Sequence, residues 1–475
     1  MKKPFAIDSA AIHRRAFLGQ SAMGTLGLLA LADLLRADQS KESIGTNLTP
    51  TAKNVICLFQ NGGPSQMDLF DPKPELNRRD GQGVSEAEKI ESINNIQNGK
   101  LMGTPFKFSQ HGMSGMELSE IIPHTAKIAD EITLIRSMVA DSVCHEAAIR
   151  EWVGGSAMVA GRPSIGSWIQ YGLGSLNENL PAYVVLPDPD GPPVWGAQNW
   201  TNGWLPAIYQ GTPILAGSAA PVLNLQPPSD VTPSARLTQL KFLSQLNRRQ
   251  LVRYFDNTEL QARIANFEMA ARMQTAVPSA VDLSQETEET KQLYGLDNPT
   301  TAPYAARALM ARRLIEQGVR YVGVYLSGQP WDTHSNNASE TKRIAAGIDQ
   351  PSAALVMDLK RRGLLESTIV VWVGEFGRTP ISEGANGRDH SRSGFSIWLA
   401  GGGFKRGYVH GTTDDIGYKA VQNPVRFCEL HATLLRALGL DHRKLTYLHD
   451  GRLDSLTDSE VTHANIIPEL LDRVG

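Results

Sequence analysis

Two strand-like runs in the second half of the chain are followed by residues that can bind metal ions. The run Tyr321–Leu326 precedes Asp332 and His334, and the run Thr368–Val373 precedes Glu375. Carboxylates and imidazoles are the side chains that a divalent cation prefers, and open α/β sheets bind ligands at the carboxyl ends of their strands. The metal ligands that this pattern predicts are Asp332, His334, Glu375, Asp389 and His390.

The chemistry of these ligands narrows the choice of metal. Two imidazoles with two or three carboxylates suit zinc, manganese or iron better than the all-oxygen shell of calcium, and zinc or manganese is the cofactor we expect. Asp332 and His334 are two residues apart, so they share a face on a strand or converge on one ion from a loop. Asp389 and His390 are expected on a loop rich in Gly, Asn and Arg. The alternative interpretation is that each residue is an ordinary polar group at the surface.

A third segment with chemical potential follows the apolar run Asn54–Gln60, which is typical of a buried strand. The turn Asn61-Gly-Gly-Pro-Ser65 offers backbone N–H groups to an anion. Ser65 is the candidate nucleophile near this first strand, and Asp68 is a further metal ligand or a partner of one. Gly-Gly-Pro is also an ordinary tight turn, so both interpretations stay open.

Basic residues flank the predicted ligands. Arg378 and Arg388 can neutralise negative charge in a reaction, because a guanidinium matches phosphate or sulfate oxygens with two hydrogen bonds. The alternative is that they are solvated arginines on loops. His145 either points into the site or caps a helix that packs beside it, and the second role is favoured.

The remaining pattern predicts a mostly parallel α/β sheet, because helical and strand-like segments alternate. The turn Gly401–Gly407 follows the strand-like run Phe395–Ala400 and is predicted to be a hairpin turn. The segment Leu180–Pro228 is dense in Pro, Gly, Asn and Trp, which predicts long loops over the active face. The helices expected from apolar spacing lie within 145–152, 234–273, 305–318, 351–362 and 424–438.

Length and composition exclude some classes of protein. A chain of 475 residues without a clear division fits one large α/β domain with elaborated loops. A net charge of −3 gives no basic footprint for nucleic acid, so nucleic acid is not an expected partner. The three cysteines are widely spaced, so neither a disulfide framework nor a zinc–cysteine site is expected.

The N-terminus is typical of an export signal. His13-Arg14-Arg15-Ala-Phe-Leu18 precedes a weakly apolar stretch, which resembles the signal read by the twin-arginine machinery. Residues 1–35 are therefore predicted to direct the protein to the periplasm or outside the cell. The apolar stretch is interrupted by glycine and aspartate, so a permanent membrane span is not expected.

Four motifs together resemble one family. They are Gly62–Asp68, Trp331–His334, Gly374–Pro380 and Arg388–His390. The sequence resembles the exported family called domain of unknown function 1501, which is grouped with the alkaline phosphatase and sulfatase superfamily. The resemblance implies a three-layer sandwich in which a mostly parallel sheet lies between helices. The domain is expected at residues 50–455, with a loop-rich insertion at about 180–230, a helical insertion at about 234–300 and a C-terminal tail at 456–475.

The resemblance also implies a function, which is metal-assisted hydrolysis of a phosphate or sulfate ester in a small molecule or glycan. Asp332, His334, Glu375 and His390 stand at positions similar to the superfamily's metal ligands. The chain departs from the pattern, because Asn61 replaces the usual first-strand Asp, Phe376 replaces a histidine, and the sulfatase nucleophile motif is missing. The alternative is therefore an exported binding protein without catalysis, for an anionic glycan or a cell-envelope partner.

Overall fold

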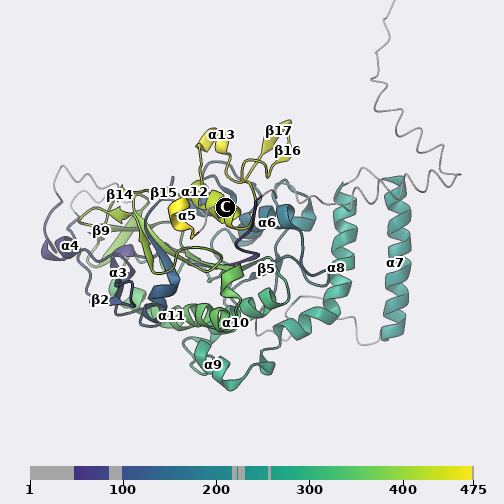
Figure 1. Cartoon of the computed structure of the whole chain (residues 1–475), viewed down its shortest axis with the longest axis horizontal. Helices are drawn as coiled ribbons and strands as arrows, with labels where there is room; N and C mark the ends of the chain where they lie inside the picture. The colour runs from purple at the N-terminus through teal and green to yellow at the C-terminus, as the bar shows by residue number, and fades with distance from the viewer. Residues whose placement is uncertain (1–47, 85–98, 217–221, 223–230, 255–257, 473–475) are drawn as a thin grey trace, which may run out of the picture. The chain divides into compact units, whose positions relative to one another are not determined.

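The buried runs of β-branched and aromatic residues form the central strands, as expected for segments that are covered on both faces. The computed structural model describes residues 48–84, 99–216, 222, 231–254 and 258–472 (Figure 1). The strands are β1 Asn54–Phe59, β2 Phe108–His111, β3 Met116–Ser119, β4 Ile132–Val139, β5 Tyr183–Leu186, β6 Thr212–Pro213, β7 Tyr321–Tyr325, β8 Thr368–Val373, β9 Gly377–Glu383, β10 Gly387–Ser391, β11 Phe395–Ala400, β12 Tyr408–His410, β13 Thr412–Thr413, β14 Ala420–Gln422, β15 Val425–Arg426, β16 Tyr447–His449 and β17 Arg452–Asp454.

Most helices pack against the sheet, and several begin at a recognisable cap. The hydroxyl of Thr287, for example, accepts a hydrogen bond from the backbone N–H of Thr290 at the start of α9. The α-helices are α3 Gln66–Leu69, α4 Pro74–Arg78, α5 His145–Gly154, α6 Ile165–Leu173, α7 Pro233–Arg253, α8 Thr258–Val281, α9 Glu288–Tyr294, α10 Ala302–Glu316, α11 Asn337–Arg361, α12 Phe427–Ala437 and α13 Ser459–Thr462. The 3₁₀ helices are η1 Thr125–Glu131, η2 Gly196–Trp200, η3 Ala207–Tyr209, η4 Leu283–Gln285, η5 Leu365–Ser367 and η6 Pro468–Leu470.

The main sheet is mixed and mostly parallel. Its strand order is β12-β4-β11-β8-β1-β7-β5-β6, and β15 also pairs with β4. Strand β11 runs antiparallel to both β4 and β8, whereas the other pairings within this sheet are parallel. The prediction of a mostly parallel α/β sheet is therefore confirmed.

Two apolar cores cover the two faces of the sheet. Along β1, Ile56 and Leu58 belong to the core formed with helices α10 and α11, whereas Val55, Cys57 and Phe59 belong to the core formed with α5, α6 and α12. This alternation follows from the two-residue period of a strand. The helices therefore lie on opposite sides of the sheet and make three layers (Figure 1), as predicted.

Three details differ from the sequence-based expectations. The turn Gly401–Gly407 is not a hairpin, because β11 and β12 flank β4 on opposite sides and do not pair with each other. The expected loop region Leu180–Pro228 contains the buried strand β5, whose four residues are too few to reveal a period. The predicted tail packs on the domain through buried Leu470 and Leu471.

The chain divides into two units, Met1–Ile44 and Gly45–Gly475. The predicted export signal lies in the first unit, outside the described residues. No described helix has the length and apolar character that crossing a membrane requires.

A buried histidine in α12 makes stability depend on pH. Burial lowers the pKa of His431 to about 3, well below the value of about 6.5 expected in the unfolded chain. The unfolded state therefore binds a proton more readily between these two pKa values, and the folded state loses up to about 1.4 kcal/mol for each pH unit below 6.5. Urea unfolding of the wild type and of His431→Leu at pH 7.5 and pH 5 tests this. The variant should lose less stability on acidification, and an equal loss in both proteins would contradict the assignment.

Candidate metal centre

The topology brings four loops to one edge of the sheet. Strands β8, β1 and β7 are adjacent and parallel, so the segments after Phe59, Tyr325 and Val373 leave from the same edge. Strand β4 has the same direction, because β11 is antiparallel to both β4 and β8. The entrance to antiparallel β11, which follows the hairpin β9–β10, therefore lies at this edge too. Sites in open α/β sheets lie at this position.

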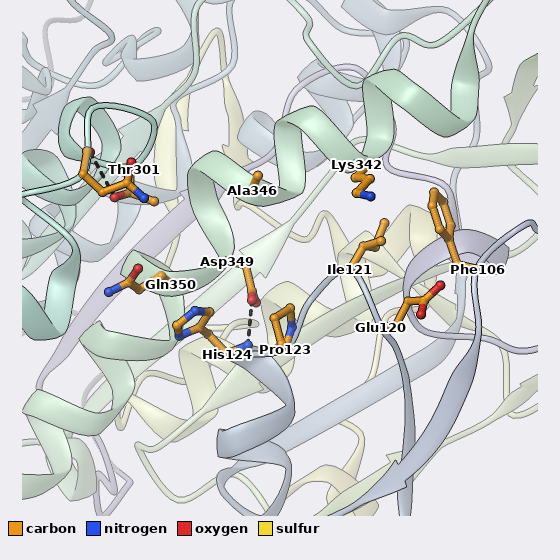
Figure 2. Close-up of a pocket in the computed structure, with 11 residues that line it drawn as sticks. Phe106, Glu120, Ile121, Pro123, His124, Thr301, Lys342, Ala346, Asp349 and Gln350 are labelled. Atoms are coloured by element: carbon orange, nitrogen blue, oxygen red, sulfur yellow. Dashed lines mark hydrogen bonds between the residues drawn. The ribbon is translucent and has the colours of Figure 1, made fainter.

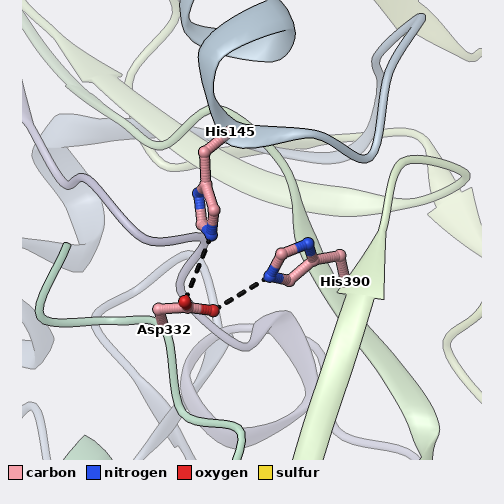
Figure 3. Close-up of side chains that lie close together, drawn as sticks. All are labelled: His145, Asp332 and His390. Carbon is pink, nitrogen blue, oxygen red and sulfur yellow. Dashed lines mark hydrogen bonds and ion pairs between the residues drawn. The ribbon is translucent and has the colours of Figure 1, made fainter. Parts of the chain in front are cut away.

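Three ligand atoms form a tight triangle there. The Nε2 atom of His334 and the Nε2 atom of His390 each lie 2.9 Å from Oδ1 of Asp332, and the two nitrogens are 3.0 Å apart. Metal–ligand distances of 2.0–2.1 Å imply separations of about 2.9–3.4 Å between neighbouring ligand atoms. The triangle therefore fits the ligand set of one divalent cation. Figure 3 shows Asp332 between His390 and a further imidazole, His145.

The outer nitrogen of each imidazole has an acceptor. Nδ1 of His390 lies 2.8 Å from the carbonyl oxygen of Val143, and Nδ1 of His334 contacts the carboxylate of Glu383. A carbonyl oxygen and a carboxylate accept hydrogen bonds, so each Nδ1 carries a proton in this arrangement. Such outer partners fix the orientation of metal-binding histidines.

These contacts have an electrostatic consequence at the centre of the triangle. With both Nδ1 atoms protonated, two neutral imidazoles direct their Nε2 lone pairs toward each other and toward the Asp332 carboxylate. Three electron-rich atoms this close repel one another unless a positive charge lies among them. A proton on one Nε2 atom can form a hydrogen bond with only one of the other two ligand atoms. The hydrogen bond to Asp332 favours such a proton on His334, because it raises the pKa of His334. A metal ion satisfies all three ligand atoms at once.

His145 and Glu375 extend the cluster. Nδ1 of His145 lies 2.7 Å from Oε1 of Glu375, and its Nε2 lies 3.3 Å from Oδ2 of Asp332. Burial lowers the pKa of His145, but hydrogen bonds to Asp332 and Glu375 outweigh it and raise the pKa to about 9. The Glu375 side chain is fully buried and its Oε2 atom has no hydrogen-bond partner among the described residues. Such an orphaned oxygen is rare in folded proteins and fits a site built to hold a cation.

Arg378 joins the loops behind the triangle and is fully buried. Its guanidinium donates to the carbonyl oxygens of Gly62, Gly63, Trp331 and Arg388. The same group lies 2.7 Å from Oδ1 of Asp332. With its donors occupied in this way, Arg378 positions Asp332 and does not face a substrate.

A second buried network lies beside the triangle and contains Ser65, Asp68 and Arg388. Asp68 and Arg388 are fully buried and form an ion pair with 3.0 Å between Oδ2 and Nε. The same Oδ2 atom accepts hydrogen bonds from the Ser65 hydroxyl at 2.6 Å and from the Asn337 amide at 2.8 Å. These contacts hold α3, β10 and α11 together. Because Ser65, Asp68 and Arg388 are buried, none of their polar groups faces a substrate.

The structure therefore sorts the predicted site residues into two groups. It brings together Asp332, His334, Asp389 and His390, since ligand atoms of His334, Asp389 and His390 also lie within 4.8 Å of one another. Glu375 joins them through His145. By contrast, both carboxylate oxygens of Asp68 contact the Arg388 guanidinium, so its role as a metal ligand stays a prediction that the geometry does not support. The same holds for the catalytic roles predicted for Ser65, Arg378 and Arg388.

Some site residues were misjudged or missed from the sequence. Asp389 and His390 lie in strand β10 and not in a loop. His145 points into the site from the first turn of α5, although the helix-capping role was favoured. A histidine six residues after the end of strand β4 was the available signal. Glu383 had no such signal, because it is brought to His334 only by the pairing of β9 with β10.

A cavity also lies away from the metal triangle. It has a volume of about 450 Å³ and is bounded by α11 and the segment before η1 (Figure 2). Both oxygens of its Asp349 carboxylate are occupied, by the backbone N–H groups of His124 and Thr125 and by the Thr125 hydroxyl. None of the residues in the metal triangle lines this cavity, so the site is assigned from its chemistry and not from cavity size.

The close approach of β10 to the Asp332 loop requires glycine at position 387. A Cβ atom on Gly387 would lie 1.8 Å from the backbone oxygen of His334. We therefore expect Gly387→Ala to push His334 away from His390 and to weaken metal binding by about tenfold or more, as other changes that misplace a ligand do. Metal titration of the purified variant checks this. Gly83→Ala is the matched control, because a Cβ there meets nothing within 4 Å, and equal metal binding in all three proteins would contradict the expectation.

Fold and site together define a class of protein: a three-layer α/β protein whose sheet edge carries a cluster of two to three imidazoles and several carboxylates. The chain matches the family described as "Protein of unknown function (DUF1501)" over residues 52–471. It belongs to this family, as the sequence motifs predicted. No curated protein has a sequence that matches it.

Several solved structures are similar to this chain. A phosphonate monoester hydrolase from Silicibacter pomeroyi has 10% sequence identity, covers 87% of this chain and 77% of its own, and gives a TM-score of 0.33. A sulfatase from Pseudoalteromonas sp. has 13% identity, 86% and 71% coverage and a TM-score of 0.35. A protein of the alkaline phosphatase superfamily from Vibrio parahaemolyticus has 10% identity, 87% and 76% coverage and a TM-score of 0.36. Similarity at this level carries no information about the function of this chain.

Proposed function

We propose that this protein is an exported, metal-dependent hydrolase of phosphate or sulfate esters. The observation that carries the proposal is the triangle of Asp332 Oδ1, His334 Nε2 and His390 Nε2, whose edges measure 2.9–3.0 Å. These three residues would hold the cation, and zinc or manganese suits two imidazoles and a carboxylate best. When bound, such a cation supplies Lewis acidity, which polarises an ester oxygen and lowers the pKa of a coordinated water.

The surrounding residues fix the ligands in place. Glu383 and the Val143 carbonyl hold the two imidazoles in the tautomer that offers Nε2 to the cation. Arg378 holds the Asp332 carboxylate in place. Burial raises the pKa of Asp332, but hydrogen bonds from His145, His334 and His390, together with the charge of Arg378, outweigh burial and lower the pKa far below the usual range. The ligand set therefore needs little rearrangement to bind metal.

His145 is the residue best placed to transfer a proton. Its side chain is 11% exposed, and its Nε2 atom faces Asp332 beside the other two imidazoles. Burial lowers the pKa of His145, but hydrogen bonds to Asp332 and Glu375 outweigh burial and favour the protonated imidazole. A protonated imidazole beside the cation site can donate that proton to the leaving oxygen of an ester, as a general acid. We assign this role to His145 within the proposed mechanism.

The buried positions of Ser65, Arg378 and Arg388 favour attack by water over attack by a side chain. Ser65 is 2% exposed and its hydroxyl is committed to Asp68. Negative charge on the substrate would therefore be balanced by the cation and by protonated His145, since both arginines are occupied within the protein.

A panel of aryl phosphate and sulfate esters, assayed with purified protein that has been loaded with zinc or manganese, tests the proposal. We expect turnover by the wild type, loss of turnover in His390→Ala, and turnover retained in Ser65→Ala. No turnover of any ester by the loaded wild type would contradict the hydrolase. Equal turnover in the wild type and His390→Ala would remove the metal triangle from the reaction.

One observation favours a second function, an exported binding protein of the same fold. The described site offers no accessible side-chain nucleophile at Ser65 and no accessible guanidinium from Arg378 or Arg388. An anionic glycan or a cell-envelope partner would then bind at the cation without being cleaved. Binding of a sulfated polysaccharide by metal-loaded protein that releases no product would support this function over the first.

A further inference from the structure

Helix α7 carries large apolar side chains that point into solvent. Phe242 is 59% exposed and Val252 is 81% exposed, while Leu243 and Leu246 are 47% and 39% exposed. In a water-soluble helix these side chains would normally face the protein. Their exposure along a helix of 21 residues indicates an interaction surface that an apolar partner covers.

Among the described residues, the protein covers one face of α7. The half-buried positions recur every three or four residues, which is the spacing of one helical face. They are Arg236, Leu240, Ser244, Asn247 and Leu251. Helix α8 packs against α7 and in turn contacts α10 and η3. The two helices therefore form a hairpin whose outer face, on α7, is open.

The charge of α7 is unusual for this chain. The helix contains five basic residues and no Asp or Glu, although the whole chain has a net charge of −3. Its basic residues are Arg236, Lys241, Arg248, Arg249 and Arg253. Within the described part of the chain, no ion pair neutralises any of them. The helix therefore presents a positive potential that a negatively charged surface would satisfy.

Apolar and basic side chains share the outer face in one stripe. Phe242, Leu246, Arg249 and Arg253 follow the spacing i, i+4, i+7 and i+11, which places them on the same side of a helix. Leu243 lies on one flank of this stripe. Helices that lie on membranes combine these two kinds of side chain, because apolar groups enter the acyl boundary while long basic side chains reach the phosphates.

The geometry points to docking of α7 on a membrane surface that contains anionic phospholipid. A second copy of the chain fits less well, because five positive charges on each helix would repel. Nucleic acid would match the charge but not the exposed Phe and Leu side chains. The contact is peripheral, since none of the described helices is suited to cross a bilayer. It would hold the domain near a lipid surface through the α7–α8 hairpin and does not depend on the metal centre.

Vesicle sedimentation of the full chain tests this inference. We expect about tenfold or stronger binding to vesicles of phosphatidylcholine and phosphatidylglycerol than to vesicles of phosphatidylcholine alone, because each basic residue near an anionic surface adds affinity. High salt should weaken the binding. Equal binding to both vesicles, or to neither, would overturn the inference. Binding to polyglutamate with no binding to either vesicle would overturn it in favour of an acidic protein partner.

Two variants separate the contributions of the outer stripe. Phe242→Ser with Leu246→Ser removes the apolar part and keeps every charge, and Arg249→Gln with Arg253→Gln removes two charges and keeps the apolar part. Each pair should lower binding to the anionic vesicles severalfold. The control, Arg78→Gln with Arg343→Gln, removes two exposed cations elsewhere and should bind like the wild type. Wild-type binding by both stripe variants, or an equal loss in the control, would assign the binding to another surface.

Discussion

Asp332→Asn should remove most of the bound metal. Oδ1 of Asp332 lies 2.9 Å from Nε2 of His334 and 2.9 Å from Nε2 of His390, so both of these histidines contact this oxygen. An amide oxygen has no negative charge with which to balance a cation. Loss of an outer partner alone typically weakens metal affinity 10- to 100-fold, so loss of this ligand should weaken it by about 100-fold or more. Mass spectrometry of the metal content after dialysis measures the effect.

A matched acidic residue serves as the control for this variant. Asp415 is exposed, and Asp415→Asn changes the same charge away from the site. It should retain the metal content of the wild type. Circular dichroism should show that both variants are folded. Retention of metal by Asp332→Asn at the wild-type level would show that the triangle does not bind the ion.

Asp68→Ala is expected to cause the largest loss of stability. The change leaves the fully buried guanidinium of Arg388 without its counter-charge and deprives Ser65 and Asn337 of their acceptor. Removing one partner of a buried ion pair costs about 3–5 kcal/mol. Urea unfolding at neutral pH measures this loss.

An exposed ion pair provides the comparison for Asp68→Ala. Arg78 and Glu75 form a contact of 2.6 Å at the surface, and Glu75→Ala should cost less than about 1 kcal/mol, because solvent screens such pairs. An equal loss of unfolding free energy in Asp68→Ala and Glu75→Ala would show that the buried Asp68–Arg388 pair does not stabilise the fold more than an exposed pair does.

The Asp68 pair also has a defined dependence on pH. Burial raises the pKa of Asp68, but the charge of Arg388 and several hydrogen bonds outweigh it and lower the pKa below its usual value. A lowered folded pKa contributes stability above the unfolded pKa of about 3.9, and this stability is lost as the pH falls through the folded pKa. The difference in stability between wild type and Asp68→Ala should therefore be present at pH 7 and shrink below about pH 4.

The central part of the fold was predictable because its strands are buried on both faces. Runs such as Asn54–Phe59 and Thr368–Val373 are fully apolar apart from their first residues, and both are strands of the sheet. The sequence could not reveal that β11 runs antiparallel, because periodicity within a strand does not encode the direction of its neighbour. The short strand Tyr183–Leu186 was hidden among turn residues, because four residues are too few to show a period.

The position of the candidate site was predictable from polar residues that follow strands. The roles of its buried arginines were misread. The side chains of Asp332, His334 and His390 lie together, and their role as metal ligands stays a prediction. Arginines were expected to face a substrate, but Arg378 and Arg388 are fully buried and bind carbonyl oxygens and carboxylates. Residue type alone does not distinguish a guanidinium that binds ligand from one that ties loops together. That distinction depends on which loops meet, and only the structure supplies it.

A crystal structure of metal-loaded protein, with anomalous scattering recorded at the absorption edge of the metal, tests the central claim most directly. We predict one anomalous peak bounded by Oδ1 of Asp332, Nε2 of His334 and Nε2 of His390. A map without a peak at this position, or with the two imidazoles directed away from Asp332, would contradict the metal centre and the hydrolase built on it.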